Sequence, residues 1–374
     1  MRAEGVRRSP VSGWGDRARL ARFFAALAVK EHLIPQLNVK PLVAELFLTD
    51  NCNLKCVSCA CWRTVTRNEL DTAEWRAVID QLAEAGVLKL NFTGGEPLLR
   101  RDAPELMAYA VSKGITNLHL NTNAVLLDER RRKAVLDAGV RSFNISVDGP
   151  DAGTHEAVRG VRGSFDRTLR NLDALLARRE ELNLRVRIMF TVMRRNLDSL
   201  PEMMRTAQRL QVPLYLNLAS DSTFLFRDPQ VSAEAKVDRD DVDRVLAEVE
   251  EILRHDRRFL PRPSELSYLR AHFTERVQRR LPCAESQLKL MVHSRGEMGG
   301  CWGHDPQTST RQTTVRTLLK SPAYREEHTK FFRKECVGCG SNYALNLRWR
   351  PNSYLRDASW RLGRRDLATL SAMT

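Results

Sequence analysis

Three closely spaced cysteines are the residues of this sequence best suited to chemistry. They lie in the stretch Cys52-Asn53-Leu54-Lys55-Cys56-Val57-Ser58-Cys59. Iron–sulfur clusters are bound by cysteine thiolates, so three thiolates on one short stretch can converge on a single soft metal centre. A cubane [4Fe–4S] cluster has four irons, and three local cysteines leave one iron open for a substrate or cofactor. The spacing therefore predicts an open iron–sulfur cluster.

Two other interpretations of the triplet remain on spacing alone. Structural zinc usually takes two C-x₂-C pairs, and a C-x₃-C-x₂-C triplet fits that pattern less well without excluding it. Disulfides are not expected, because no secretory signal precedes the cysteines and such close neighbours would strain one another.

A glycine-rich turn is the second chemical feature. Gly94-Gly95-Glu96-Pro97 directly follows the apolar run from Leu88 to Thr93. Glycine lets the backbone come near a ligand, and backbone carbonyls together with the Glu96 carboxylate can accept hydrogen bonds from a cationic amine. The alternative is an ordinary tight turn after a strand.

The triplet and the turn together resemble the radical S-adenosylmethionine (radical SAM) superfamily, over about residues 42–218. The resemblance implies a [4Fe–4S] cluster on Cys52, Cys56 and Cys59, with S-adenosylmethionine (SAM) bound to its open iron. It also implies that the methionine amino group of SAM meets the turn formed by Gly94, Gly95, Glu96 and Pro97. Reductive cleavage of SAM would then give a 5′-deoxyadenosyl radical that abstracts hydrogen from a substrate, the protein supplying placement.

A third segment extends the resemblance. Ser146-Val147-Asp148-Gly149, with His155-Glu156 and Arg159-Gly160 downstream, is similar to a run found in the larger-substrate branch of the superfamily. The resemblance assigns Ser146 and Arg159 to the methionine carboxylate, which suits the two parallel hydrogen bonds of a guanidinium. Asn121 and Asn123 match the region near the ribose, with Ala124 where glycine is usual.

Two residues near the triplet depart from the family pattern. Ser58 occupies a position that is often aromatic and close to adenine, and Trp62 is a candidate to replace that ring. Cys61 is an additional thiol, which we expect to be a bystander.

Four further cysteines form a second group. The spacing of Cys283, Gly296 and Cys301, followed by a C-x₂-C pair, resembles SPASM and Twitch auxiliary-cluster domains, and the shorter Twitch form most. The resemblance implies an auxiliary [4Fe–4S] cluster bound by Cys283, Cys301, Cys336 and Cys339. Structural zinc is the alternative, because zinc also takes four cysteines.

Six strand–helix units must position these residues. Hydrophobic patterns predict strands at 42–49, 88–93, 119–122, 142–147, 185–192 and 213–218. They predict helices at 72–85 (with Thr72 as N-cap), 103–113, 127–138, 164–180, 197–210, 239–255 and 262–280. The fold class is therefore α/β, an incomplete (β/α)₆ TIM-like barrel with its ligand loops at the carboxyl ends of the strands.

The domain organisation follows from these patterns. We expect five consecutive parts: a basic N-terminal segment with an amphipathic helix (1–41), a radical SAM partial barrel (42–220), a helical linker region that begins with a loop at Asp221–Val237 (221–281), a Twitch/SPASM-like cluster domain (282–341) and a basic tail (342–374).

Charge and hydropathy bear on partners and location. The net charge is +14, and residues 1–40 carry eight Lys and Arg against three Asp and Glu. A basic segment of this kind attracts anionic surfaces. The helix at 17–34 is therefore expected either to lie on an anionic membrane or to pack across the core. Nucleic acid is not the expected partner. With no apolar run of membrane-spanning length, we expect a cytoplasmic protein that is at most peripheral at the membrane.

The expected function is that of a radical SAM oxidoreductase-type enzyme. It would oxidise a small biosynthetic molecule in a dehydrogenase-like reaction, with the auxiliary cluster accepting an electron and flavodoxin or ferredoxin as donor. One alternative is maturation of a ribosomally made peptide by crosslinking or epimerisation, disfavoured because about forty residues before the barrel are too few for a peptide-recognition domain. The other is a non-catalytic metal-binding or membrane-docking protein. The sequence identifies no substrate base.

Overall fold

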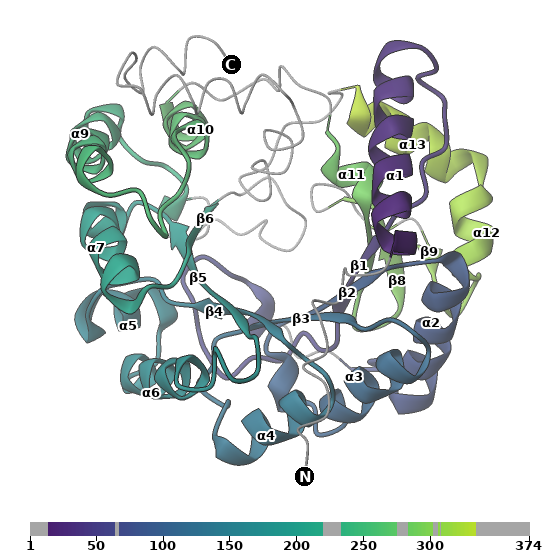
Figure 1. Cartoon of the computed structure of the whole chain (residues 1–374), viewed down its shortest axis with the longest axis horizontal. Coiled ribbons are helices and arrows are strands. Elements are labelled where there is room, and N and C mark those ends of the chain that lie inside the picture. Colours follow the sequence, from purple (N-terminus) through teal and green to yellow (C-terminus); the bar gives the residue numbers. More distant parts are fainter. Residues whose placement is uncertain are drawn as a thin grey trace.

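A single curved sheet forms the centre of the protein. The computed structural model describes residues 14–63, 67–219, 233–274, 283–301, 306 and 308–333. Within these residues the sheet has nine strands, in the order β6-β5-β4-β3-β2-β1-β7-β8-β9. Strands β1 to β7 pair in parallel, and β8 and β9 are antiparallel additions. Helices cover the outer side of the curve (Figure 1), so the predicted incomplete barrel is confirmed.

All six predicted parallel strands are present, with ends shifted by at most two residues. They are β1 (Val43–Phe47), β2 (Lys89–Thr93), β3 (Asn117–Thr122), β4 (Ser142–Ser146), β5 (Arg185–Val192) and β6 (Leu214–Leu218). The sheet continues through β7 (Lys289–Val292), β8 (Glu297–Gly299) and β9 (Thr308–Ser309). Because β7 pairs with β1, the segment after residue 282 begins inside the barrel sheet. The division into domains stays a prediction.

The helices also follow the expected pattern. They are α1 (Trp14–His32), α2 (Thr72–Ala85), α3 (Ala103–Ser112), α4 (Glu129–Asp137), α5 (Ala152–Arg159), α6 (Ser164–Leu176), α7 (Leu200–Leu210), α9 (Arg239–His255), α10 (Pro263–Thr274), α11 (Glu285–Leu288), α12 (Val315–Lys320) and α13 (Pro322–Phe332). Short 3₁₀ turns η1 (Cys61–Arg63), η2 (Pro97–Leu99) and η3 (Leu197–Ser199) precede or interrupt them. The sequence did not predict α5. Most of the loop expected at Asp221–Val237, and the end of the helix expected at 262–280, lie outside the described residues.

The N-cap predicted for α2 is wrong by one residue. Asp71, not Thr72, is the cap: its carboxylate accepts from the Glu74 backbone N–H at 2.8 Å, and Glu74 accepts from the Asp71 N–H at 2.9 Å. This reciprocal pair is a capping box, which satisfies two backbone donors at once. Thr72 instead donates its hydroxyl to Asp102.

The two faces of the sheet differ in polarity. Every second residue of the strands faces outward into one apolar core under the helices, as Leu46, Leu90, Leu120, Ile145 and Ile188 do. The alternate residues face the inner side of the curve, and they are largely polar or charged. The inner side is thus the part of the barrel that can hold a polar ligand.

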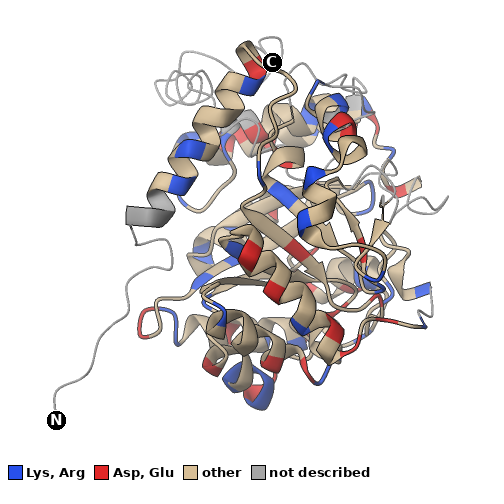
Figure 2. Ribbon diagram, turned by 90° about the vertical axis from the view of Figure 1, so that its right-hand side faces the viewer, with Lys and Arg blue, Asp and Glu red and all other residues tan. Residues whose placement is uncertain are grey.

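Helix α1 packs against a small apolar cluster beside the main core. Phe23 and Leu27 are buried there with Val39, Ala284 and Phe332, so the helix packs on the segments near α11 and α13. Basic residues occur along α1 (Figure 2). Arg19 and Arg22 are exposed and Lys30 is buried, and a role of the helix at a membrane surface stays a prediction. No helix among the described residues is long and apolar enough to span a bilayer.

Candidate metal and cofactor site

The cysteine loop lies at the carboxyl end of β1, beside the end of α5. Two backbone hydrogen bonds join them, from Lys55 N–H to the Arg159 carbonyl and from Val57 N–H to the Val158 carbonyl, both at 3.0 Å. Gly160 follows at φ +69°, and a Cβ there would lie 2.4 Å from the Lys55 carbonyl oxygen. The end of α5 therefore has to be glycine for the cysteine loop to dock this closely.

Several donors within the described part of the chain point at the cysteine sulfurs. The Leu54 N–H lies 3.5 Å from Cys52 Sγ, and Asn123 Nδ2 lies 3.9 Å from the same sulfur. Arg159 Nη1 lies 3.7 Å from Cys56 Sγ. Hydrogen bonds to the sulfurs are the means by which proteins stabilise and tune iron–sulfur clusters. The donor set thus fits an iron–sulfur cluster.

The cysteines are held as thiols in the absence of a cation. Burial raises the pKa of Cys52 to about 12 and that of Cys56 to about 11. A hydrogen bond with Cys61, followed by burial, raises the pKa of Cys59 well above its usual value. Metal ligands must be thiolates, so iron has to displace these protons as it binds.

No three His, Cys, Asp or Glu side chains of the described residues converge on one metal ion. A cubane does not require such convergence, because each cysteine of the set binds a different iron atom.

A buried ion pair places a positive charge beside this loop. Arg159 Nη2 lies 2.7 Å from the Asp148 carboxylate, with side chains 12% and 2% exposed. Although burial disfavours its charge, Asp148 and Cys56 raise the pKa of Arg159 above its usual value. The Asp148 carboxylate also accepts from the Thr191 N–H at 2.7 Å. Within the described chain the buried Arg159 Nε has no hydrogen-bond partner, so Arg159 keeps a donor for a ligand.

Glu96 ties the ends of β2 and β3 together. It is 0% exposed, and burial raises its pKa to about 7. Its carboxylate accepts from Thr122 Oγ1 at 2.8 Å, from the Asn123 N–H at 2.9 Å and from the Leu98 N–H at 3.1 Å. Glu96 thereby positions Asn123, and its part in holding an amine stays a prediction.

The two glycines of the turn are required by packing against the loop after β1. A Cβ on Gly94 would lie 2.3 Å from the Thr49 carbonyl oxygen, and one on Gly95 would lie 2.3 Å from that of Asn51. Gly94 also has φ +135°, which L side chains rarely adopt. The sequence predicts that these glycines allow a close ligand approach, and the packing against the loop after β1 is a second reason for them.

The two predicted asparagines occupy different places. Asn123 joins the cysteine loop, donating to Asn53 Oδ1 at 2.8 Å. Asn121 lies deeper, on the inner face, where its Oδ1 accepts from Asn144 Nδ2 at 2.8 Å. Ala124 has a φ of +58°, in the left-handed region that favours glycine.

Ser146, Pro97, Trp62 and Cys61 also lie at this edge. Ser146 is the last residue of β4, and Pro97 begins η2. The Trp62 indole donates to the Cys56 carbonyl at 3.1 Å, so its ring lies against the cysteine loop. Cys61, expected to be a bystander, is hydrogen-bonded to Cys59.

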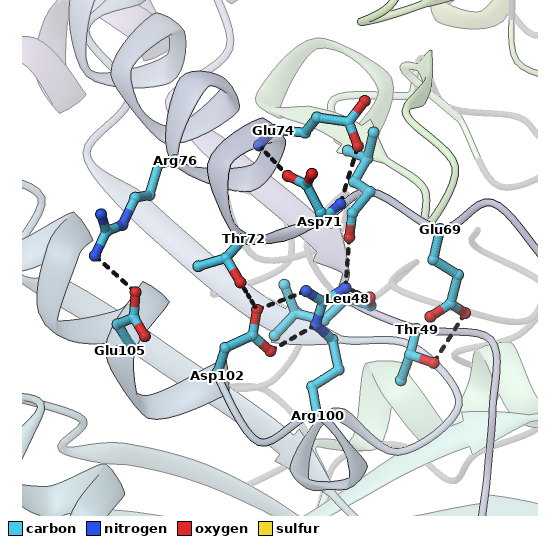
Figure 3. A network of polar contacts seen from close by, with 11 residues as sticks. Leu48, Thr49, Glu69, Asp71, Thr72, Glu74, Arg76, Arg100, Asp102 and Glu105 are labelled. Atoms are coloured by element: carbon cyan, nitrogen blue, oxygen red, sulfur yellow. Dashed lines mark hydrogen bonds and ion pairs between the residues drawn. The ribbon is translucent and has the colours of Figure 1, made fainter.

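A polar network that the sequence did not reveal braces the start of the loop (Figure 3). Arg100 donates to the carbonyls of Leu48 and Leu70, at 3.2 and 2.7 Å, and forms an ion pair with Asp102. Glu69 accepts from Thr49 Oγ1 and from the Asp50 N–H, both at 2.9 Å. The sequence places Arg100 just after the glycine turn, which could have indicated a role near the site. The carbonyls to which it donates belong to two other segments, so the sequence does not indicate them.

The predicted auxiliary cysteines are only partly described. Cys283 is buried just before α11, and Cys301 is partly buried just after β8. Cys336 and Cys339 lie outside the described residues. The four-cysteine cluster therefore stays a prediction.

Comparison with known proteins shows what the chain resembles. Residues 46–207 match the model of the radical SAM superfamily. A Fe-coproporphyrin III synthase of Methanosarcina barkeri is 34% identical over 184 residues, covering 49% of this chain and 45% of the relative. A PqqA peptide cyclase of Rhodopseudomonas palustris is 37% identical over 172 residues, covering 46% and 44%. The chain thus spans a little under half the length of the curated relatives it matches.

Solved structures share the fold. Streptococcus suis SuiB bound to precursor peptide SuiA superposes with a TM-score of 0.62 at 16% identity, covering 88% of this chain and 75% of that one. The protein anSMEcpe with bound AdoMet gives a TM-score of 0.60 at 17% identity, covering 89% and 99%. At these identities the likeness concerns the fold alone.

Proposed function

We propose that the segment matching the radical SAM superfamily model, residues 46–207, takes a hydrogen atom from an organic substrate held on the inner face of the barrel. The observation that carries the proposal is the meeting of three segments at one edge of the sheet. There the cysteine loop, the Gly94–Pro97 turn and the Asp148–Arg159 pair lie together, with donors aimed at two cysteine sulfurs.

The proposal assigns a role to each predicted residue. Cys52, Cys56 and Cys59 would hold the [4Fe–4S] cluster. The methionine part of SAM would meet Gly94, Gly95, Glu96 and Pro97 through its amine and Ser146 and Arg159 through its carboxylate, with Asn121 and Asn123 towards the ribose. When bound, the cluster and SAM supply the organic radical that removes hydrogen.

The chain itself contributes position and charge. Asp148 holds Arg159 by a buried ion pair, which leaves the Arg159 Nε free to donate within the described chain. The Glu96 carboxylate accepts from the Asn123 N–H at 2.9 Å, and Asn123 Nδ2 lies 3.9 Å from Cys52 Sγ. Placement of this kind, prepared before the cofactor arrives, is the protein's part in cofactor chemistry.

For the overall reaction we propose oxidation of a small molecule. After loss of a hydrogen atom, the substrate radical would give up one electron and one proton. Cys283, Cys301, Cys336 and Cys339 would hold the auxiliary [4Fe–4S] cluster that accepts that electron, and a flavodoxin or ferredoxin would supply the reducing electron for SAM. All-cysteine ligation suits such a cluster.

Maturation of a ribosomally made peptide is the second candidate. PqqA peptide cyclases occur among the sequence relatives, and the SuiB fold binds a precursor peptide in the solved complex. These names support a peptide substrate as much as a small molecule. The radical SAM domain disfavours the third alternative, a non-catalytic metal-binding protein.

Cleavage of SAM tests the proposal. The full chain, reconstituted with iron and sulfide without oxygen, should convert SAM to 5′-deoxyadenosine and methionine in equal amounts once a strong reductant is added. Chromatography with mass detection measures both products. Iron-loaded protein that leaves SAM intact after reduction would contradict the proposed function.

A further inference from the structure

Three basic side chains share the inner face of the barrel, well below the cofactor edge. Lys89 is the first residue of β2, and Arg185 and Arg187 are the first and third residues of β5. All three are partly buried. Pairing places Lys89 opposite Asn117 on β3 and Arg187 opposite Asn144 on β4, in the alternating set that faces away from the apolar core. We call Lys89, Arg185 and Arg187 the inner basic group.

The acids nearby are already committed to another cation. Lys289 forms ion pairs with Glu45, at 2.9 Å, and with Glu285. Among the described residues, none of the inner basic group forms an ion pair with an acid. Arg185 donates to Asn117 Oδ1 at 3.3 Å, and Arg187 lies over the Tyr215 ring, 5.5 Å from its centroid. The face therefore carries an excess of positive charge.

This arrangement is costly without a counter-ion. Burial, followed by the charges of Lys289, Arg187 and Arg185, lowers the pKa of Lys89 to about 8 despite the opposing effect of Glu45. Burial, followed by the charges of Lys89 and Arg187, keeps the pKa of His119 well below its usual range, so His119 adds no charge. Like charges in a partly buried site destabilise the fold until an anion joins them.

Unused acceptors lie on the same face. Asn91 Oδ1 and Asn144 Oδ1 are buried and have no hydrogen-bond partner within the described chain. Asn91 is the neighbour of Glu45, and Asn144 stands opposite Arg187. A buried polar atom left without a partner costs free energy, so these oxygens also point to a ligand, one with hydroxyl or amine donors.

We infer that the inner basic group binds an anionic group, a carboxylate or a phosphate, of the substrate itself. The inference rests on the proposed function and names its substrate class. Lys89 precedes Thr93, the last residue of β2, by four positions, which is roughly 13 Å along the strand. The anion would thus lie deep in the barrel, away from Ser146 and Arg159, to which the carboxylate of SAM is assigned. The substrate then reaches from the cofactor edge into the barrel.

Anion binding by the full chain tests the inference without SAM or reductant. The probes are inorganic phosphate and glutarate. Each is titrated into the protein and its binding is measured by calorimetry at constant ionic strength, with sodium chloride as the control salt. We expect one of them to bind, and we expect Lys89→Met and Arg187→Gln each to weaken its binding at least tenfold. Matched controls are Lys133→Met and Arg170→Gln, which remove the same charges from exposed outer helices and should leave affinity unchanged.

The unliganded variants separate a binding role from a structural one. If the inner basic group is kept for a ligand, Lys89→Met removes a repelling charge, and the unfolding midpoint without anion stays equal or rises. Lower midpoints in both variants with unchanged affinity, or no binding of either probe, would overturn the inference. Phosphate binding alone would identify a phosphorylated substrate, and glutarate binding alone a carboxylate. A chain that binds these anions yet leaves SAM intact would contradict only the proposed function.

Discussion

Replacing Cys52, Cys56 and Cys59 together by alanine is expected to reduce SAM cleavage to the level seen without enzyme. The open iron exists only if the cluster is held by these three thiolates, so their loss removes both the cluster and the place where SAM binds. Production of 5′-deoxyadenosine by the reduced, reconstituted protein is the measurement. Iron analysis should show roughly half of the wild-type content, since one of two cubanes is lost.

The control for this variant is Cys61→Ala. Cys61 is hydrogen-bonded to Cys59 but lies outside the family triplet, so we expect its loss to preserve the cluster and most of the cleavage. Normal cleavage by the triple variant would contradict the assignment of these three cysteines as cluster ligands. Loss of iron in Cys61→Ala would show that Cys61 is a ligand.

The Cys336→Ala, Cys339→Ala double variant should have the reverse effect. With two cubanes the intact chain should contain roughly eight irons, and this variant should keep roughly four and still cleave SAM. Product formation should stop, because the electron left on the substrate has no acceptor. If elemental analysis finds zinc in place of the second set of irons, the electron-transfer role is contradicted and the auxiliary site is a structural zinc site.

The elements of the barrel were predictable because their patterns are regular. Alternation in β5 and the helical spacing of α9 gave the observed bounds without change. Helix α5 was missed because it is short, and among its residues only His155 and Val158 are buried. The N-cap of α2 was misplaced by one residue. Glu74 lies three residues after Asp71, which is the spacing of a capping box, and this spacing favours Asp71 over Thr72.

The site was predictable only where its residues are local in sequence. The cysteine triplet and the glycine turn each lie on one short segment, and the two together carry the resemblance to the radical SAM superfamily. Contacts such as Arg159 with Cys56, Glu96 with Asn123 and Arg100 with Leu48 join segments from 27 to 103 positions apart. No periodicity encodes such pairs. The inner basic group appears only when β2 and β5 are placed in one sheet.

Binding of SAM to the open iron, on which the proposed function depends, can be observed directly. Electron–nuclear double resonance of the reduced protein with SAM labelled by ¹⁵N and ¹⁷O in its methionine group reports whether those atoms touch the cluster. We expect nitrogen and oxygen couplings in the wild type and none in the Cys52, Cys56, Cys59 triple variant. An iron-loaded, reduced wild type that shows a cluster signal but no coupling to labelled SAM would contradict the account.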